Sequence, residues 1–152
     1  MNILIVDDEP SYRMLVSKFL QEQGWTIFSA KDGEDGLKKL YETKMDFVIS
    51  DVYMPGMDGI KFYSAVRRIP RYAEVPFLFV SAYDDEYTLQ AIKNPRIEGF
   101  LRKARTLDEL KAWIVYLSTP IEKRPPTPPG KAASDISADW RREETRKPRS
   151  RR

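Results

Sequence analysis

Short apolar runs recur along the first 117 residues of the chain and predict the strands of a sheet. The first run, Ile3-Leu4-Ile5-Val6, is apolar on successive residues, which is typical of a strand buried on both faces. The same criterion predicts further strands over residues 25–29, 47–50, 77–80 and 99–102. The last of these runs is the most polar, and we therefore expect it at an edge of the sheet.

Apolar residues at helical spacing fill the intervals between these runs. They predict helices over residues 10–23, 34–41, 60–69, 84–93 and 107–117. Pro10 suits the first turn of the first helix, and Gly24 suits its C-terminal cap. We expect the inward face of this helix to carry Met14, Leu15, Phe19 and Leu20. Five strand–helix units in series predict an α/β domain with a parallel sheet and helices on both faces, because parallel crossovers are right-handed and cover the sheet.

The last predicted helix has two kinds of apolar position. The residues expected to face the core are Leu107, Leu110, Ile114 and Leu117. Trp113 and Tyr116 fall off that face. Either they are exposed, which makes them candidates for a partner or homodimer contact, or they pad the edge of the sheet or are covered by the tail.

Composition excludes several kinds of chemistry, because the chain lacks both cysteine and histidine. Disulfides, thiolate or imidazole metal sites and Ser–His–Asp catalysis are excluded, so chemistry must use carboxylates, lysines, hydroxyls and an oxygen-binding metal ion. The net charge of +3 is uneven, since residues 1–117 carry 16 basic and 18 acidic side chains whereas residues 118–152 carry 10 and 5.

The chain contains no apolar run that approaches the roughly 20 residues of a membrane helix. Its first apolar run is too short for a signal peptide and is followed at once by aspartates. We therefore expect a cytoplasmic protein with no membrane partner.

Polar side chains that can bind a ligand or take part in a reaction follow four of the predicted strands. They are Asp7-Asp8-Glu9 after the first, Asp51 after the third, Ser81 after the fourth and Lys103 after the fifth. Because sites in parallel α/β sheets lie outside the carboxyl ends of the strands, we expect these side chains to share one crevice. Clustered carboxylates repel one another unless a cation lies among them, and oxygen donors alone favour Mg²⁺, which also pairs with phosphate. A carboxylate can attack a phosphoryl donor to form an acyl phosphate.

Each of these residues alone also has an ordinary explanation. An aspartate after a strand is usually a helix cap or a loop residue, Lys103 is by itself a solvated charge, and Ser81 is by itself a helix cap. Four such residues at the strand ends of one predicted sheet make coincidence improbable.

Four segments within residues 1–117 carry a family resemblance. They are residues 3–10 (ILIVDDEP), 51–59 (DVYMPGMDG), 80–82 (VSA) and 100–103 (FLRK). The second segment is highly specific, and the intervals of 30 residues from Asp51 to Ser81 and 52 from Asp51 to Lys103 also fit. On these residues the chain resembles the receiver domain of two-component response regulators, the CheY-like family. The resemblance implies a flavodoxin-like (βα)5 fold with strand order 2-1-3-4-5.

The resemblance also implies a role for each matching residue. Asp51 would accept a phosphoryl group, and Lys103 would bind a phosphate oxygen. Ser81 and Phe100 would be switch residues, the hydroxyl moving to the phosphoryl group and the ring turning inward. The implied ligands of Mg²⁺ are Asp7, Asp8, Asp51 and the backbone carbonyl of Tyr53.

The sequence departs from the family pattern in three places. Ala104 follows Lys103 where a proline, commonly with a cis bond, is usual, so the reach of Lys103 is in doubt. Phe100 replaces the commoner tyrosine. Tyr53 and Tyr83 place large rings two residues after the acceptor and two after the switch hydroxyl, where the family tunes the lifetime of the phosphoryl group.

Residues 118–152 differ in composition from the predicted receiver of residues 1–117. They hold six of the 11 prolines, four of them within residues 125–129, which predicts a basic, polyproline II or disordered tail. Residues 134–147 could form a short helix. The tail is too short for an output domain, and it is either solvated, a docking segment or a nonspecific nucleic-acid contact.

The function predicted on these grounds is a phosphorylation switch. Its expected partners are a sensor histidine kinase or phosphotransfer protein, an unidentified output protein, and a second copy through the face of the fourth helix, fifth strand and fifth helix. A pseudo-receiver that works without phosphate is an alternative, supported mainly by Ala104. A Mg²⁺-dependent aspartyl phosphohydrolase is disfavoured, because Tyr53 stands where such enzymes generally place an acid.

Overall fold

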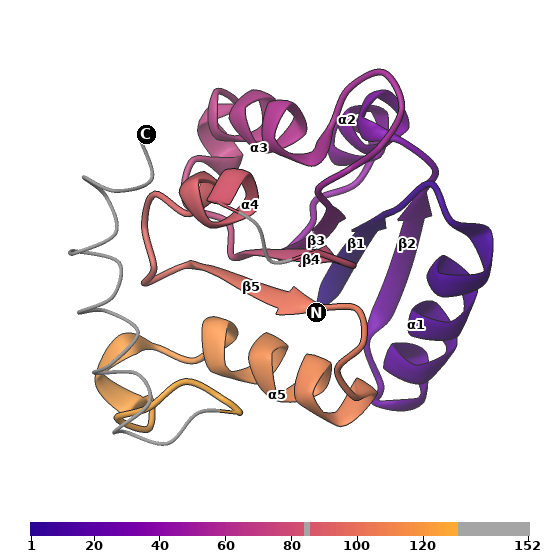
Figure 1. The fold of residues 1–152 in the computed structure, drawn as a ribbon. Helices are drawn as coiled ribbons and strands as arrows, with labels where there is room; N and C mark the ends of the chain where they lie inside the picture. Colours follow the sequence, from indigo (N-terminus) through magenta and orange to yellow (C-terminus); the bar gives the residue numbers. More distant parts are fainter. Residues whose placement is uncertain (84–85, 131–152) are drawn as a thin grey trace.

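The predicted strands form one parallel sheet in the computed structural model, which describes residues 1–83 and 86–130 (Figure 1). The strands are β1 (Asn2–Val6), β2 (Thr26–Ala30), β3 (Phe47–Asp51), β4 (Phe77–Ser81) and β5 (Glu98–Arg102). Their order in the sheet is β2-β1-β3-β4-β5, and every neighbouring pair is parallel. This order confirms the predicted fold class and the position of the last strand at an edge.

Helices connect the strands and cover both faces of the sheet. They are α1 (Pro10–Glu22), α2 (Gly33–Glu42), α3 (Gly59–Arg67), α4 (Glu86–Ala91) and α5 (Leu107–Ser118), with short 3-10 turns η1 (Pro70–Tyr72) and η2 (Ile121–Lys123). Helices α1 and α5 lie on one side of the sheet, and α2, α3 and α4 lie on the other (Figure 1). Gly24 has a φ of 93° just after α1, the left-handed conformation expected of a C-terminal cap glycine.

Alternation along each strand divides the core into two layers. In β1, Leu4 and Val6 join a cluster with residues of α2 and α3, whereas Ile3 and Ile5 join a cluster with residues of α1 and α5. All four of these side chains are fully buried. A strand covered on both faces must be apolar at every position, which is why the continuous apolar runs predicted the strands so closely.

The prediction for the inward face of α1 was partly wrong. Met14 is 72% exposed and Leu15 is 53% exposed, while Val16 and Leu20 are the fully buried residues of this helix. Three successive apolar residues at 14–16 allow more than one helical stripe, and the stripe through Val16 and Leu20 is the one that faces the sheet.

Of the two alternatives for Trp113 and Tyr116, exposure or packing at the edge of the sheet, the structure shows the second. Both side chains are partly buried and pack against the cluster between α1, α5 and the sheet. The ring of Trp113 lies over Gly99 of β5, so closely that a Cβ atom there would be 2.7 Å from it. The missing side chain at Gly99 makes room for this ring.

A buried acid at the start of β5 was not anticipated from the sequence. Glu98 is 3% exposed, and its Oε2 lies 2.9 Å from the guanidinium of Arg67 and 2.6 Å from the hydroxyl of Tyr63. Its Oε1 accepts the backbone N–H groups of Lys93 and Asn94. These contacts satisfy the charge and attach the loop before β5 to α3.

Two predictions fall partly or wholly outside the described residues. The predicted helix at 84–93 begins at residues 84–85, which are not described, and α4 is observed from Glu86 to Ala91. The short helix predicted for residues 134–147 lies wholly outside the described part of the chain.

Candidate functional site: an acidic pocket at the carboxyl edge of the sheet

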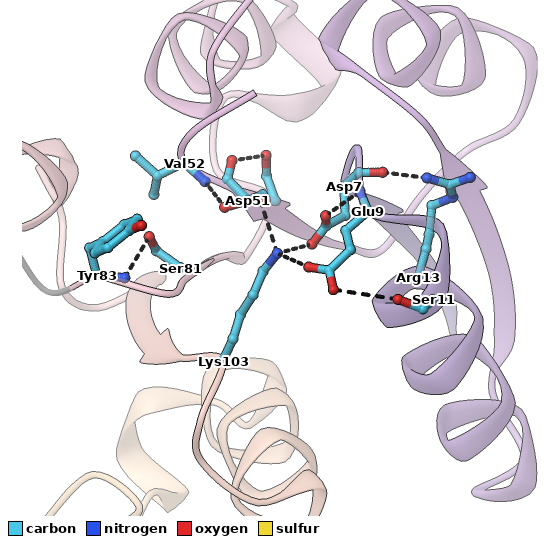
Figure 2. Close-up of polar contacts among 10 residues, drawn as sticks. Asp7, Glu9, Ser11, Arg13, Asp51, Val52, Ser81, Tyr83 and Lys103 are labelled. Atoms are coloured by element: carbon cyan, nitrogen blue, oxygen red, sulfur yellow. Dashed lines mark hydrogen bonds and ion pairs between the residues drawn. The ribbon is translucent and has the colours of Figure 1, made fainter. Parts of the chain in front are cut away.

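Two aspartates follow β1 at the carboxyl edge of the sheet. Asp7 is fully buried, and its Oδ1 accepts the backbone N–H of Glu9 at 2.9 Å (Figure 2). Asp8 is exposed. The carbonyl oxygen of Asp7 accepts a hydrogen bond from the guanidinium of Arg13, which attaches the loop to the first turns of α1. One carboxylate is therefore held in place while its neighbour faces solvent.

Asp51 is the last residue of β3 and is only 6% exposed. Its Oδ1 accepts the N–H of Val52 at 2.7 Å. The first residue of α3, Gly59, lies against the backbone of Asp51, and a Cβ atom at Gly59 would overlap the Asp51 carbonyl oxygen. Glycine is therefore required at Gly59 for α3 to approach this strand so closely.

Lys103 joins the two buried carboxylates. Its Nζ lies 2.8 Å from Asp7 Oδ2 and 3.0 Å from Asp51 Oδ2, and the side chain is 14% exposed. Glu9 Oε2 lies 3.4 Å from the same nitrogen, so the lysine stands at the centre of the acidic cluster (Figure 2). The ring of Tyr12 adds a cation–π contact, with its centroid 4.7 Å from Nζ.

The doubt about the reach of Lys103 is resolved by this geometry. Among the described residues every peptide bond is trans, including the bond between Lys103 and Ala104. The lysine nevertheless contacts Asp51, because its backbone N–H donates to the carbonyl of Ser81 and holds it against the end of β4.

Burial and charge compete in the pocket. Desolvation raises the pKa of Asp51 and of Asp7 above the ordinary value, although Lys103 acts in the opposite direction on both. Burial itself disfavours the Lys103 ammonium, but its contacts with Asp7 and Asp51 hold the pKa of the lysine above its usual range. Burial also raises the pKa of Tyr12 to about 12. The pocket thus holds more negative charge than one lysine can neutralise.

The donor set fits a hard divalent cation. Asp7, Asp8 and Asp51 each offer a carboxylate oxygen, and these three oxygens lie within 4.8 Å of one another. The set contains oxygen donors only, which suits Mg²⁺. Asp7 Oδ2 is buried and makes no hydrogen bond of good geometry besides its ion pair with Lys103, so it retains capacity for a cation.

The two predicted switch residues lie on β4, the strand next to that of Asp51, and on β5, the strand beyond it. Ser81 ends β4, one residue beyond Val80, which pairs with Asp51 in the sheet. Its Oγ accepts the backbone N–H of Tyr83 at 3.1 Å. Phe100 lies on β5 opposite Phe79, and it packs, partly buried, against the cluster of α2 and α3.

Three tyrosines form a cluster centred on Tyr53, two residues after Asp51, one more than the sequence suggested. The Tyr53 ring lies 5.8 Å from that of Tyr83 in an edge-to-face arrangement and 6.1 Å from that of Tyr87. The Tyr87 hydroxyl donates to Asp58, which also caps α3. Tyr87 was overlooked because it lies in a predicted helix and not at the end of a strand. The available signal was its position in the first turn of the helix that follows the fourth strand.

Tyr12 and Arg13 were missed as parts of the site, whereas Glu9 had been expected there with Asp7 and Asp8. The helical pattern gave Tyr12 and Arg13 ordinary positions in the first turns of α1. Their common signal is closeness in sequence to Asp7 and Asp8, since a helix that starts directly after an acidic loop brings its first turns to the same edge of the sheet.

Comparison with known proteins agrees with this geometry. The model of the response regulator receiver domain family matches residues 3–115, and the chain belongs to that family. It is 39% identical over 113 residues to a probable chemotaxis protein CheY of Rhizobium etli, a match that covers 74% of this chain and 88% of the relative.

Two solved structures support the same assignment. The chemotaxis protein CheY4 of Vibrio cholerae is 33% identical, with a TM-score of 0.72 over 76% of this chain and 97% of that protein. The response regulator TrrA of Thermotoga maritima, solved in complex with Mg²⁺-BeF, is 32% identical, with a TM-score of 0.66 and the same coverage of both chains. The protein is therefore a phosphoacceptor signalling module with a CheY-like fold and an acidic pocket at Asp7, Asp8 and Asp51, rather than a conventional enzyme.

No helix within residues 1–83 and 86–130 has both the length and the apolar character to cross a bilayer.

Proposed function

We propose that Asp51 accepts a phosphoryl group and that the resulting acyl phosphate switches the surface of the protein. The observation that carries this proposal is the meeting of Asp51 with Asp7, Asp8 and Lys103 at the carboxyl edge of the sheet. An Asp51 carboxylate oxygen attacks phosphorus, and the bond from phosphorus to the donor's leaving group breaks. Lys103, already 3.0 Å from Asp51 Oδ2, then binds a phosphoryl oxygen.

The switch follows from the same geometry. A phosphoryl group on Asp51 offers new acceptor oxygens beside Ser81, whose Oγ is held in a local contact with Tyr83. We propose that the Ser81 hydroxyl leaves that contact to donate to the phosphoryl group. Phe100 on the adjacent β5 then turns further into the core. A mass measurement on Asp51 variants, described in the Discussion, tests the acceptor.

Mg²⁺ is the proposed cofactor, held by Asp7, Asp8, Asp51 and the carbonyl of Tyr53. When bound, it neutralises the carboxylates and the incoming phosphoryl oxygens. Asp8 is the exposed ligand and can be changed without disturbing the core.

We expect Mg²⁺ to raise the melting temperature of the wild-type protein, because a ligand of the folded state stabilises it by about 2.7 kcal/mol at one hundred times its dissociation constant. In Asp8→Asn the same magnesium concentration should give a much smaller rise, measured by scanning fluorimetry or calorimetry. Asp46→Asn, an aspartate at the opposite edge of the sheet, is the matched control. An equal magnesium effect in Asp8→Asn and in the wild type would contradict the assignment.

The phosphoryl donor follows from the family, since receiver domains pair with histidine kinases. We propose a sensor histidine kinase or a phosphotransfer protein as donor, an output protein that reads the switched surface, and a cytoplasmic location. The face formed by α4, β5 and α5 is the proposed surface for self-association. In this assignment residues 1–117 are the receiver, and residues 118–152 are an appended basic tail.

The phosphorylated state should be long-lived. Hydrolysis needs a water molecule in line with the bond between Asp51 and phosphorus, and the rings of Tyr53 and Tyr83, 5.8 Å apart, stand beside Asp51. Since misplacing a reactant can change a rate by up to about a hundredfold, Tyr53→Asn and Tyr83→Ala should both lose the phosphoryl group faster. Dephosphorylation after removal of the donor measures this rate.

Tyr41→Ala provides the control for this experiment, because Tyr41 is a 70% exposed tyrosine on α2. Slower loss in either site variant would mean that a tyrosine hydroxyl positions the water instead of excluding it.

A further inference from the structure

The chain does not leave the domain when α5 ends. After Ser118 it makes the turn η2 and runs back along α5, as the orange segment at the bottom of Figure 1 shows. Gly130 lies near the first turn of α5, where a Cβ atom on it would be 3.3 Å from Glu109 Oε2. Residues 119–130, here called the strap, therefore follow the helix over its length.

Arg124 fastens the strap to the domain. Its guanidinium carbon lies 5.0 Å from the centroid of the Tyr116 ring. Its nitrogens donate to the carbonyls of Leu117 and Thr119 at the end of α5 and to the carbonyl of Arg96 in the loop before β5. One side chain thus satisfies the last carbonyls of a helix and links the strap to a second element.

Beyond Arg124 the strap forms one wall of an apolar groove of about 470 Å³ on the outer side of α5. The helix supplies Ala112, Val115 and Tyr116, and the strap supplies Pro125, Thr127 and Pro129. These strap residues lie at positions 125, 127 and 129 of an extended segment. Arg124, with φ −74° and ψ 148°, already has polyproline II geometry.

We propose that the outer face of α5 is a docking surface for an extended, proline-rich segment and that residues 125–130 of this chain are held against it, where they form one wall of the groove. An aromatic floor beside small apolar residues suits such a segment, because polyproline II chains lose little entropy on docking. Arg124 is the latch that keeps the segment in place. The tail is therefore not a free linker at its start, and any partner that uses this face of α5 competes with it.

The groove also explains how a proline-rich stretch with too few apolar residues for a core remains attached. Its contacts come from a helix that is already folded, so the strap needs only local contacts and the polar latch. Val115 on the floor remains 47% exposed, which leaves the groove open along one side and the strap displaceable.

Thiol labelling can test the docked strap, because the natural chain has no cysteine. Ala112→Cys places one thiol on the groove floor of the full chain, and its rate of reaction with a water-soluble maleimide reports access to the groove. We expect slow labelling relative to Lys18→Cys on the exposed side of α1. Adding Arg124→Ala should speed labelling of Ala112→Cys by at least about tenfold, because the variant loses three hydrogen bonds and a single one of ordinary strength already shifts an opening equilibrium by about that factor.

Lys123→Ala is the matched control, since it removes the same charge from the adjacent, exposed position. It should leave the labelling rate unchanged. Thr127→Lys, which puts a charge into the groove from the strap and cannot disturb the core, should also speed labelling. A melting temperature close to that of Ala112→Cys alone shows that each variant still folds.

Two results would overturn the proposal. One is labelling of Ala112→Cys as fast as Lys18→Cys in the otherwise natural chain, which would mean that the strap does not cover the groove. The other is an equal rate in the Arg124→Ala, Thr127→Lys and Lys123→Ala backgrounds, which would mean that neither the latch nor the strap residues hold it there. Neither result depends on phosphorylation of Asp51.

Discussion

Asp51→Asn should gain no mass when incubated with acetyl phosphate and Mg²⁺, whereas the wild-type protein gains one phosphoryl group. The amide keeps the shape of the side chain but lacks the nucleophilic oxygen of the carboxylate. Intact mass spectrometry measures the outcome directly, and Asp51→Ala should behave in the same way. Asp46→Asn, the same change at the other edge of the sheet, should be labelled like the wild type.

The free energy of unfolding of Asp51→Asn shows whether a loss of phosphorylation comes from the missing carboxylate or from misfolding. Because burial raises the pKa of Asp51, the ionised carboxylate is less favourable in the folded than in the unfolded protein, and this cost is present at pH values above the raised pKa. Without Mg²⁺, Asp51→Asn should therefore be at least as stable as the wild type at neutral pH. Equal labelling of the two proteins would exclude Asp51 as the acceptor.

Lys103→Met should cause the largest loss of stability among changes in the pocket, about 3–5 kcal/mol at neutral pH without metal, since it leaves buried carboxylates with no counter-charge. Asp7 and Asp51 are both buried, and Lys103 contacts each within 3.0 Å. Denaturant unfolding measures the loss. Phosphorylation from acetyl phosphate should fall as well, because the phosphoryl oxygens lose their cation.

The pH dependence of this loss gives a second check. In Lys103→Met the pKa values of Asp7 and Asp51 should rise further, so the folded variant holds protons that the unfolded chain has released. The stability deficit should then narrow as the pH falls below these raised values and widen as the pH rises. Lys38→Met, at an exposed lysine of α2, should change stability by no more than about 0.5 kcal/mol. A deficit that is small and independent of pH would contradict the central place of Lys103.

The sequence was sufficient for the sheet and for the core of the pocket. Strands covered on both faces need apolar residues at every position, so continuous apolar runs located β1, β3 and β4. The more polar edge strands β2 and β5 were also placed to within one residue at either end. Residues after parallel strands share one edge, so the convergence of Asp7, Asp51 and Lys103 could be predicted without coordinates.

The failures come from positions that local pattern leaves undetermined. The apolar residues of α1 allowed two stripes, and packing chose the one that exposes Met14 and Leu15. The Trp113 ring can pack inward because Gly99, on another element of the fold, has no side chain to occupy that space. Coverage of this helix by the tail was only one of two open alternatives, because the attachment of the strap depends on Tyr116 and on main-chain carbonyls, which composition does not reveal.

The position of β5 has a mechanical consequence. Within the described residues this strand is hydrogen-bonded to β4 alone, while its other edge has no strand beside it. Lys103 follows β5 directly, and Phe100 lies within it. The phosphoryl group would thus be attached to β3, which has a strand on each side, whereas Lys103, which would bind it, follows β5, which has a strand on one side only. A displacement of Lys103 can shift the β4–β5 pairing without disturbing the other three strand pairs. The displacement therefore acts mainly on β5 and on the helices packed against it.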